Sequence, residues 1–236
     1  MSTTNTTSNQ AIETMFKAGA HFGFSRSRRH PSSTPYIFGV KNKVEIINLE
    51  KTNELLESAK DFVKKIAGEG KSILFVSSKN EAKPAILRGA SSIDMPYVAG
   101  RWIGGTLTNF EEIKSRVAKL HSLNSQKEKG ELVKYTKKER LLIDREIENL
   151  NKFFFGLTNL NSMPGAVFVI DAKKEHIAIK EAQDKKIPVI ALCGSDNNIK
   201  GLEYPIVGND ASISSVAFFI DEIVKAYKSG KITKAV

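Results

Sequence analysis

The sequence predicts an α/β fold, a doubly wound parallel sheet that carries an inserted, protruding antiparallel helical hairpin. Two observations along the 236 residues lead to this prediction. Short apolar runs rich in Val and Ile alternate with amphipathic helical patterns, the order typical of a parallel sheet with helices on both faces. One long stretch, residues 106–155, breaks that alternation and shows only helical spacing.

Four apolar runs are the expected strands of this sheet. Their apolar residues do not alternate with polar ones, which is typical of strands buried on both faces. The runs are residues 72–76, 96–98, 166–170 and 188–192. Nearer the N-terminus, residues 36–39 and 44–47 predict an edge hairpin joined by residues 40–43.

Helical patterns lie beside these strands. In residues 51–67, one face of the expected helix carries Leu55, Leu56, Ala59, Val63 and Ile66. Similar patterns follow strand-like segments at residues 79–90, 174–185 and 211–228. Together with the strands they complete the expected doubly wound unit.

Two seams of apolar residues predict the inserted hairpin. Phe110, Ile113, Val117 and Leu120 are spaced three and four apart, as are the residues of a second seam, and such spacing is typical of packed helices. The second seam comprises Ile143, Ile147, Leu150 and Phe154. A polar link at residues 125–136 contains Gly130, so the simplest arrangement is an antiparallel hairpin.

These patterns divide the chain into four parts. A disordered Ser/Thr/Asn-rich tail is expected over residues 1–10, and a discontinuous α/β core over residues 11–104 and 157–228. The hairpin insertion occupies residues 105–156. Residues 229–236 form an expected basic tail, in which Gly230 interrupts any helix.

The charge balance points to a polyanionic partner. Lys plus Arg number 36 against 26 for Asp plus Glu, a formal net charge of +10. Nucleic acid is the first candidate for the partner and an anionic membrane surface the second. No apolar run approaches the roughly 20 residues that a membrane-spanning helix needs.

Residues 14–44 contain no Asp or Glu and carry most of the candidate RNA contacts. A segment of one charge sign with nearby aromatic residues suits phosphate contacts and occasional base stacking. The alternative is a solvated basic loop. The candidates in this segment are Lys17, His21, Arg26, Arg28, Arg29, His30, Lys41 and Lys43.

A second group of candidates surrounds the glycine pair at residues 104–105. Backbone amides before a helix are able to hold a phosphate, and Arg101 and Trp102 directly precede the pair. Asn109 and Lys114 complete this group of RNA-binding candidates. The alternative for Trp102 is a packed anchor for the hairpin.

Signals for catalysis, metal or cofactor binding are weak. A single cysteine, Cys193, excludes a disulfide framework, and the four histidines lack metal-ligand spacing. The Gly70–Ser72 triplet precedes a strand and lacks the first glycine of a P-loop, and no G-x-G-x-x-G occurs. Asp171 and Glu175 suit helix capping better than acid–base chemistry. We therefore expect no catalytic, metal-binding or cofactor-binding residues.

Several long motifs resemble, in order, those of the ribosomal protein S2 family of bacterial type. The similarity runs from about residue 12 to residue 227. The motifs are AGAHFG at 18–23, PYIFG at 35–39, IINLEKT at 46–52, GRWIGGTLTNF at 100–110, PGAVFVID at 164–171, KEHIA at 174–178 and YPIVGNDA at 204–211.

The resemblance implies a flavodoxin-like fold and a structural, non-enzymatic role in translation, on the small ribosomal subunit in the cytoplasm. The implied partners are small-subunit rRNA and neighbouring small-subunit proteins, including the large one that captures messenger RNA. A membrane and a small-molecule substrate are not among them. We expect no cofactor, with structural Mg²⁺ at the RNA interface left open.

A second hypothesis is a nucleotide- or sugar-phosphate-binding enzyme on a Rossmann-like scaffold. Ligands of such sheets bind beyond the carboxyl ends of the strands. Those ends are predicted to carry residues 77–79, Asp171 and residues 194–196. Ordinary helix-cap residues predominate among them, so we rank this hypothesis second.

Overall fold

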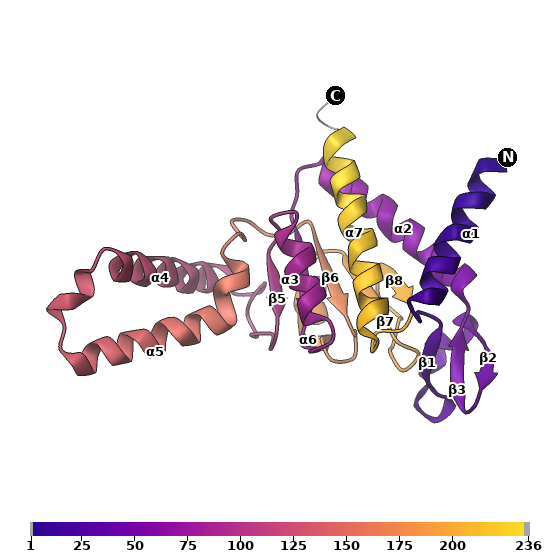
Figure 1. The fold of residues 1–236 in the computed structure, drawn as a ribbon, viewed down its shortest axis with the longest axis horizontal. Helices are drawn as coiled ribbons and strands as arrows, with labels where there is room; N and C mark the ends of the chain where they lie inside the picture. Colours follow the sequence, from indigo (N-terminus) through magenta and orange to yellow (C-terminus); the bar gives the residue numbers. More distant parts are fainter. Residues whose placement is uncertain (1, 234–236) are drawn as a thin grey trace.

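The computed structural model describes residues 2–233 of the chain and the side chains of residues 10–232. Its centre is a sheet of five parallel strands in the order β5-β4-β6-β7-β8 (Figure 1). The strands are β4 (Ile73–Ser77), β5 (Tyr97–Ala99), β6 (Ala166–Ile170), β7 (Val189–Cys193) and β8 (Tyr204–Val207). Counted along the chain, this is the flavodoxin-like order 2-1-3-4-5. The predicted α/β class, with a flavodoxin-like parallel sheet, is confirmed.

The three inner strands β4, β6 and β7 are buried at every position, and all their residues except Ser77 are apolar. Ile73 and Phe75 of β4 join one core cluster, whereas Leu74 and Val76 join another, since side chains alternate along a strand. The four predicted strands each lie within one residue of their expected bounds. The sequence prediction missed β8, a short edge strand that contains Pro205, a residue typical of sheet edges.

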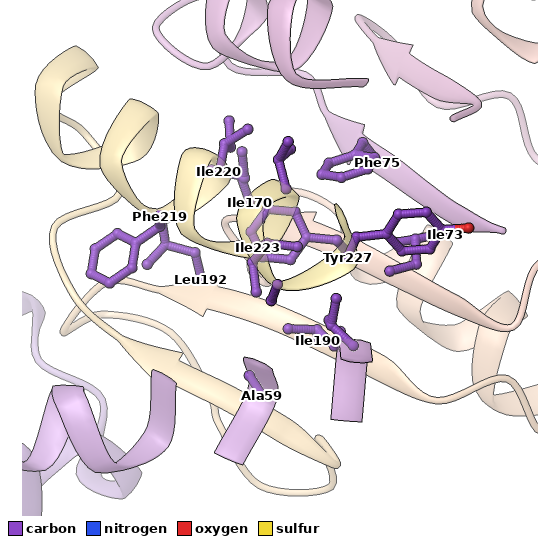
Figure 2. Close-up of a cluster of buried hydrophobic side chains, with 14 of the residues drawn as sticks. Ala59, Ile73, Phe75, Ile170, Ile190, Leu192, Phe219, Ile220, Ile223 and Tyr227 are labelled. Carbon is purple, nitrogen blue, oxygen red and sulfur yellow. The ribbon is translucent and has the colours of Figure 1, made fainter. Parts of the chain in front are cut away.

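Helices α2 (Leu49–Gly68), α3 (Lys83–Ser91) and α7 (Ile213–Thr233) cover one face of the sheet. Figure 2 shows Phe219, Ile223 and Tyr227 of α7 packed against the strand residues Ile190 and Leu192. The Asn48 side chain caps α2 by accepting hydrogen bonds from the amides of the two residues that follow Leu49. On the opposite face lie α6 (His176–Asp184) and the apolar bases of two long helices.

The two long helices are α4 (Phe110–Glu128) and α5 (Lys137–Phe154), in the segment for which the sequence predicts a hairpin. They project away from the sheet in Figure 1, joined by the short 3-10 turn Glu131–Lys134. Leu120 of α4 and Ile147 of α5 are buried in the same cluster. Ion pairs Lys119–Glu146 and Lys127–Asp144 connect the two helices. A capping box between Thr136 and Glu139 begins α5.

A second, antiparallel sheet of three strands lies at the other end of the molecule (Figure 1). Its order is β1-β3-β2, formed by β1 (Phe22–Ser25), β2 (Ile37–Lys41) and β3 (Val44–Ile47). Asn42 and Lys43 both have positive φ, as in the tight turns that suit hairpins. The predicted β2–β3 hairpin is confirmed, with its turn at Asn42 and Lys43, whereas β1 was missed.

Both predicted chain ends need correction over the described residues. Helix α1 spans Ser2–Lys17 where a disordered tail was expected, because no Gly or Pro interrupts it and Met15 anchors its last turn in the core. Helix α7 continues through Gly230 to Thr233 where a tail was expected. Residues 234–236 of that tail lie outside the described residues. Among the described residues, no helix is both long and apolar enough to cross a membrane.

Gly230 continues the helix because α7 crosses α2 closely at this point. A Cβ on Gly230 would lie 2.5 Å from the Lys64 carbonyl oxygen and 2.9 Å from the Ala67 Cβ. Gly68, at the end of α2, faces the same crossing, but its Cβ would approach nothing closer than 4.0 Å. The prediction that Gly230 breaks the helix is therefore wrong, since close packing outweighs its low helix propensity.

We predict that Gly230→Ala lowers the free energy of unfolding by roughly 1–3 kcal/mol, because the new methyl group forces the two helix backbones apart. Gly68→Ala is the matched control and should be neutral or stabilising by up to about 1 kcal/mol, since Ala favours helix and meets open space. Urea denaturation followed by circular dichroism measures both. Equal behaviour of the two variants would contradict the close crossing.

Candidate nucleic-acid interface

Five of the eight basic candidates in residues 14–44 have exposed side chains. Lys17 ends α1, and Lys41 and Lys43 flank the turn between β2 and β3. Arg26 and Arg28 lie on the 3-10 turn Arg26–Arg28, where the Arg28 guanidinium lies 5.8 Å from the centre of the Phe24 ring. Within residues 2–233, none of the five forms an ion pair with a carboxylate. They form a cationic surface at the small-sheet end of the molecule, which we call the loop surface.

Arg29 does not belong to the loop surface. Its guanidinium forms an ion pair with Glu45, with an Nη1–Oε1 distance of 3.2 Å, and the Glu45 side chain is fully buried. Glu45 is the first acidic residue after the acid-free segment 14–44, and it neutralises one arginine of that segment. We correct the expectation that Arg29 is free to contact RNA, since an unpaired buried carboxylate would be costly.

The two histidines of the segment have structural partners. The His21 ring stacks on Phe16 at 4.3 Å and also contacts Phe22 at 4.0 Å between centroids. Burial lowers the pKa of His21, so the ring is neutral near pH 7 and is a poor phosphate ligand. His30 Nδ1 lies 2.7 Å from Ser32 Oγ and accepts a hydrogen bond from the Ser32 amide.

The loop surface is held in place by the segment between β7 and β8, which sequence analysis missed. The Phe24 amide donates to Ser195 Oγ at 2.8 Å, and the His30 amide donates to the Ser195 carbonyl at 3.0 Å. Ser33 Oγ donates to the Asn197 carbonyl. These buried polar contacts fix the backbone of the basic loop before any partner binds. Only the polar run at residues 194–198 hinted at them.

The glycine pair before α4 binds an anion from the chain itself. The Glu181 carboxylate of α6 accepts hydrogen bonds from Trp102 Nε1 at 3.0 Å and from the amides of Gly105 at 2.9 Å, Leu107 at 3.0 Å and Thr108 at 3.2 Å. Burial opposes ionisation of Glu181, but these donors outweigh it and lower its pKa. The amides expected to meet phosphate are thus already occupied.

Trp102 is accordingly the packed anchor and not an exposed RNA contact. Its side chain is buried in the cluster that includes the bases of α4 and α5. The other members of the second candidate group, Arg101, Asn109 and Lys114, are exposed. Lys114 lies over the Phe110 ring at 5.6 Å. These residues lie at the base of α4, far from the loop surface along the long axis of Figure 1.

The carboxyl ends of the parallel strands are filled by the chain's own charged groups. Lys79, which is buried, lies 2.8 Å from Asp171 and 2.7 Å from Asp210. Burial opposes the charge of Lys79, but the two carboxylates outweigh it and raise its pKa. Glu175 accepts a hydrogen bond from the Ser78 amide at 2.6 Å, and burial raises the pKa of Glu175. The lysine that could attract a phosphate is thus already neutralised, which disfavours the enzyme hypothesis.

The described part of the chain was also searched for a metal site and for a reactive cysteine. No group of three or more His, Cys, Asp or Glu side chains there is arranged to hold a metal ion. Cys193 is fully buried at the end of β7, and burial raises the pKa of its thiol. Cys193 is therefore an unreactive core residue, as its apolar surroundings in the sequence predict.

Comparison with known proteins agrees with the quoted motifs. Residues 15–230 match the family model described as Ribosomal protein S2. Small ribosomal subunit protein uS2 of Psychromonas ingrahamii is 39% identical over 223 residues, which cover 94% of this chain and 91% of that protein. The uS2 proteins of Nitratiruptor sp. and Pseudoalteromonas translucida are 39% and 38% identical and cover 93% and 94% of this chain, and 82% and 92% of their own lengths.

We predict that Glu181→Gln lowers the free energy of unfolding at pH 7 by about 1–3 kcal/mol, because an amide cannot accept all of these hydrogen bonds. The folded-state pKa of Glu181 is lowered, so its contribution is present above the unfolded-state pKa and is lost as pH falls through the folded one. The difference from wild type should shrink in acid. Denaturation between pH 7 and pH 3 measures it. The control is Glu54→Gln, since Glu54 is exposed and forms no ion pair among the described residues.

We also predict that Arg29→Ala lowers the free energy of unfolding by roughly 1–3 kcal/mol, because it leaves the Glu45 carboxylate buried and unpaired. In a Glu45→Gln background the same substitution should cost less, since no buried charge remains. A double-mutant cycle by urea denaturation measures this coupling. An equal loss of unfolding free energy in both backgrounds would show that the destabilisation does not come from breaking the ion pair.

Proposed function

Because the chain belongs to the ribosomal protein S2 family, we propose that it is a structural component of the small ribosomal subunit that binds rRNA through exposed basic residues. Its site of action is the ribosome in the cytoplasm, and its role in translation is architectural and not enzymatic. The protein partners that the resemblance implies are neighbouring small-subunit proteins, including the large mRNA-capturing one.

The loop surface is the observation that carries the RNA-binding proposal. Lys17, Arg26, Arg28, Lys41 and Lys43 are exposed, and within residues 2–233 they form no ion pairs with carboxylates. The loop that bears the two arginines is already ordered by its contacts with Ser195 and Asn197, so binding costs little conformational entropy. Cations of this kind address phosphates, so specificity comes from the shape of the folded RNA.

Arg101, Asn109 and Lys114 form a second exposed group that we assign to RNA contact. They lie where α4 and α5 leave the sheet, at the opposite end of the core from the loop surface. Two separated contact regions orient a protein on RNA better than one. We assign no cofactor to the chain, and any structural Mg²⁺ belongs to the RNA side of the interface.

Sedimentation with small subunits tests the proposed function directly. Small subunits that lack this protein are mixed with the full-length chain and centrifuged through sucrose at moderate salt. We expect the chain to sediment with the subunits in stoichiometric amount. Failure to do so at any salt concentration would overturn the proposal, and stabilisation of the free protein by one nucleotide or sugar phosphate would favour the enzyme hypothesis instead.

We predict that replacing Arg26 and Arg28 by Gln flattens the salt dependence of RNA binding. Each lost phosphate contact should reduce the slope of log K against log salt by roughly 0.7–0.9. Filter binding of small-subunit rRNA between low and moderate salt measures the slope. The matched control replaces Lys180 and Lys185, two exposed lysines around the end of α6, by Gln. An identical slope in both double variants would remove the loop surface from the interface.

A further inference from the structure

A hollow opens beside β5, the outermost strand of the parallel sheet, where the start of α3 and the end of α5 meet. We call it the β5 hollow. Three cations and three aromatic residues line it: Lys83, Arg101, Lys152, Tyr97, Phe153 and Phe155. Arg101 belongs to the second group of candidates, and no pattern in the sequence places it beside the other five residues.

No carboxylate lines the β5 hollow. Among residues 2–233, Lys83, Arg101 and Lys152 form no ion pair, so their positive charge is available to a ligand. Two other hollows in the described chain are lined by both lysines and carboxylates. One contains Lys71, which pairs with Glu69 at 2.8 Å, and the other contains Lys79, which pairs with Asp171. The β5 hollow combines unpaired cations with an acid-free lining, so it attracts anions.

The aromatic lining suits a flat ring. Phe155 is 60% exposed, although Phe154 before it and Leu157 after it are both buried in the core. Phe153 is half-buried, with Lys152 lying 5.5 Å from the centre of its ring. An exposed phenyl ring offers a stacking surface to a nucleobase, and the three cations beside it are able to bind the phosphate of the same nucleotide.

The walls of the hollow are held rigidly. Gly156 lies so close to β5 that a Cβ on it would overlap the Tyr97 carbonyl oxygen and lie 2.7 Å from the Tyr97 ring. The turn Phe155–Leu157 is thus pressed against the strand, and Phe155 is presented outward in one position. A preformed hollow binds its ligand with a smaller entropic cost than a mobile loop does.

We propose that the β5 hollow receives one unpaired nucleotide of RNA. Its base stacks on Phe155, and its phosphates lie against Arg101, Lys83 and Lys152. This inference rests on the proposed function, since the nucleotide belongs to the RNA that the chain binds. It adds a contact to a single base, which the loop surface, made of phosphate-directed cations, does not provide.

Photocrosslinking in assembled small subunits is the first test. Subunits reconstituted with the full-length chain are irradiated at a wavelength absorbed by bases, and digested peptides are searched for nucleotide adducts. We expect an adduct on Tyr97, Phe153 or Phe155. Adducts confined to residues 14–44 would overturn the inference and leave the proposed function intact. A chemical crosslink from Lys83 or Lys152 to another protein, without a nucleotide adduct, would show that a protein occupies the hollow and would also overturn it.

Affinity for RNA is the second test, with a fluorescent twelve-nucleotide single-stranded RNA as the probe. Phe155→Leu should weaken binding by roughly 5- to 100-fold, the range for loss of one stacked base. Phe38→Leu is the control because Phe38 is even more exposed, at 79%, and lies beside the lysines of the small sheet. Thermal melting checks that both variants fold.

Each outcome of the second test has one meaning. A loss with Phe155→Leu that exceeds the loss with Phe38→Leu supports the inference. Equal losses, or none, overturn it, and they leave the proposed function standing if the double Gln variant of Arg26 and Arg28 still flattens the salt slope.

Discussion

The buried carboxylate of Glu181 is the contact on which the relation between the sheet and the projecting helices depends. It lies on α6, which packs on the sheet, and its donors belong to the loop that leads into α4. A carboxylate away from water is stable only where donors surround it, and backbone amides before a helix are costly without acceptors. The carboxylate on α6 and the amides of the loop therefore supply each other's hydrogen-bond partners. These hydrogen bonds determine where α4 leaves the core.

The period of the apolar residues was sufficient to predict the central sheet and most helices, because those patterns are local. The side-chain partners were not predictable in the same way. Glu181 meets Gly105 across 76 positions of sequence, and nothing in the local pattern of either residue indicates the other. Gly230 is a second residue whose structural role could not be predicted from the local sequence. Its helix-breaking tendency is local, but the helix crossing that makes a side chain intolerable there depends on Lys64 of another helix.

Net charge indicated the class of partner but not the residues that meet it. The sequence shows the basic residues without their partners, and the structure divides them by the carboxylates that they meet. Arg29 neutralises Glu45, and Lys79 neutralises two aspartates, whereas Arg26, Arg28 and Arg101 are exposed and, among the described residues, without carboxylate partners. The distinction depends on three-dimensional neighbours, so composition alone overestimates the cationic surface.

The pairing of Lys79 with two aspartates bears on the place where folds of this class commonly bind a ligand. In flavodoxin-like sheets the usual place for a ligand is beyond the carboxyl ends of the strands, where the strand order reverses. Here that place lies between β4 and β6, and Lys79 fills it with its two carboxylate partners. This internal ion cluster neutralises the positive charge of Lys79, which a phosphate would otherwise attract. The arginines of the turn Arg26–Arg28 lie outside this ion cluster and, among the described residues, pair with no carboxylate.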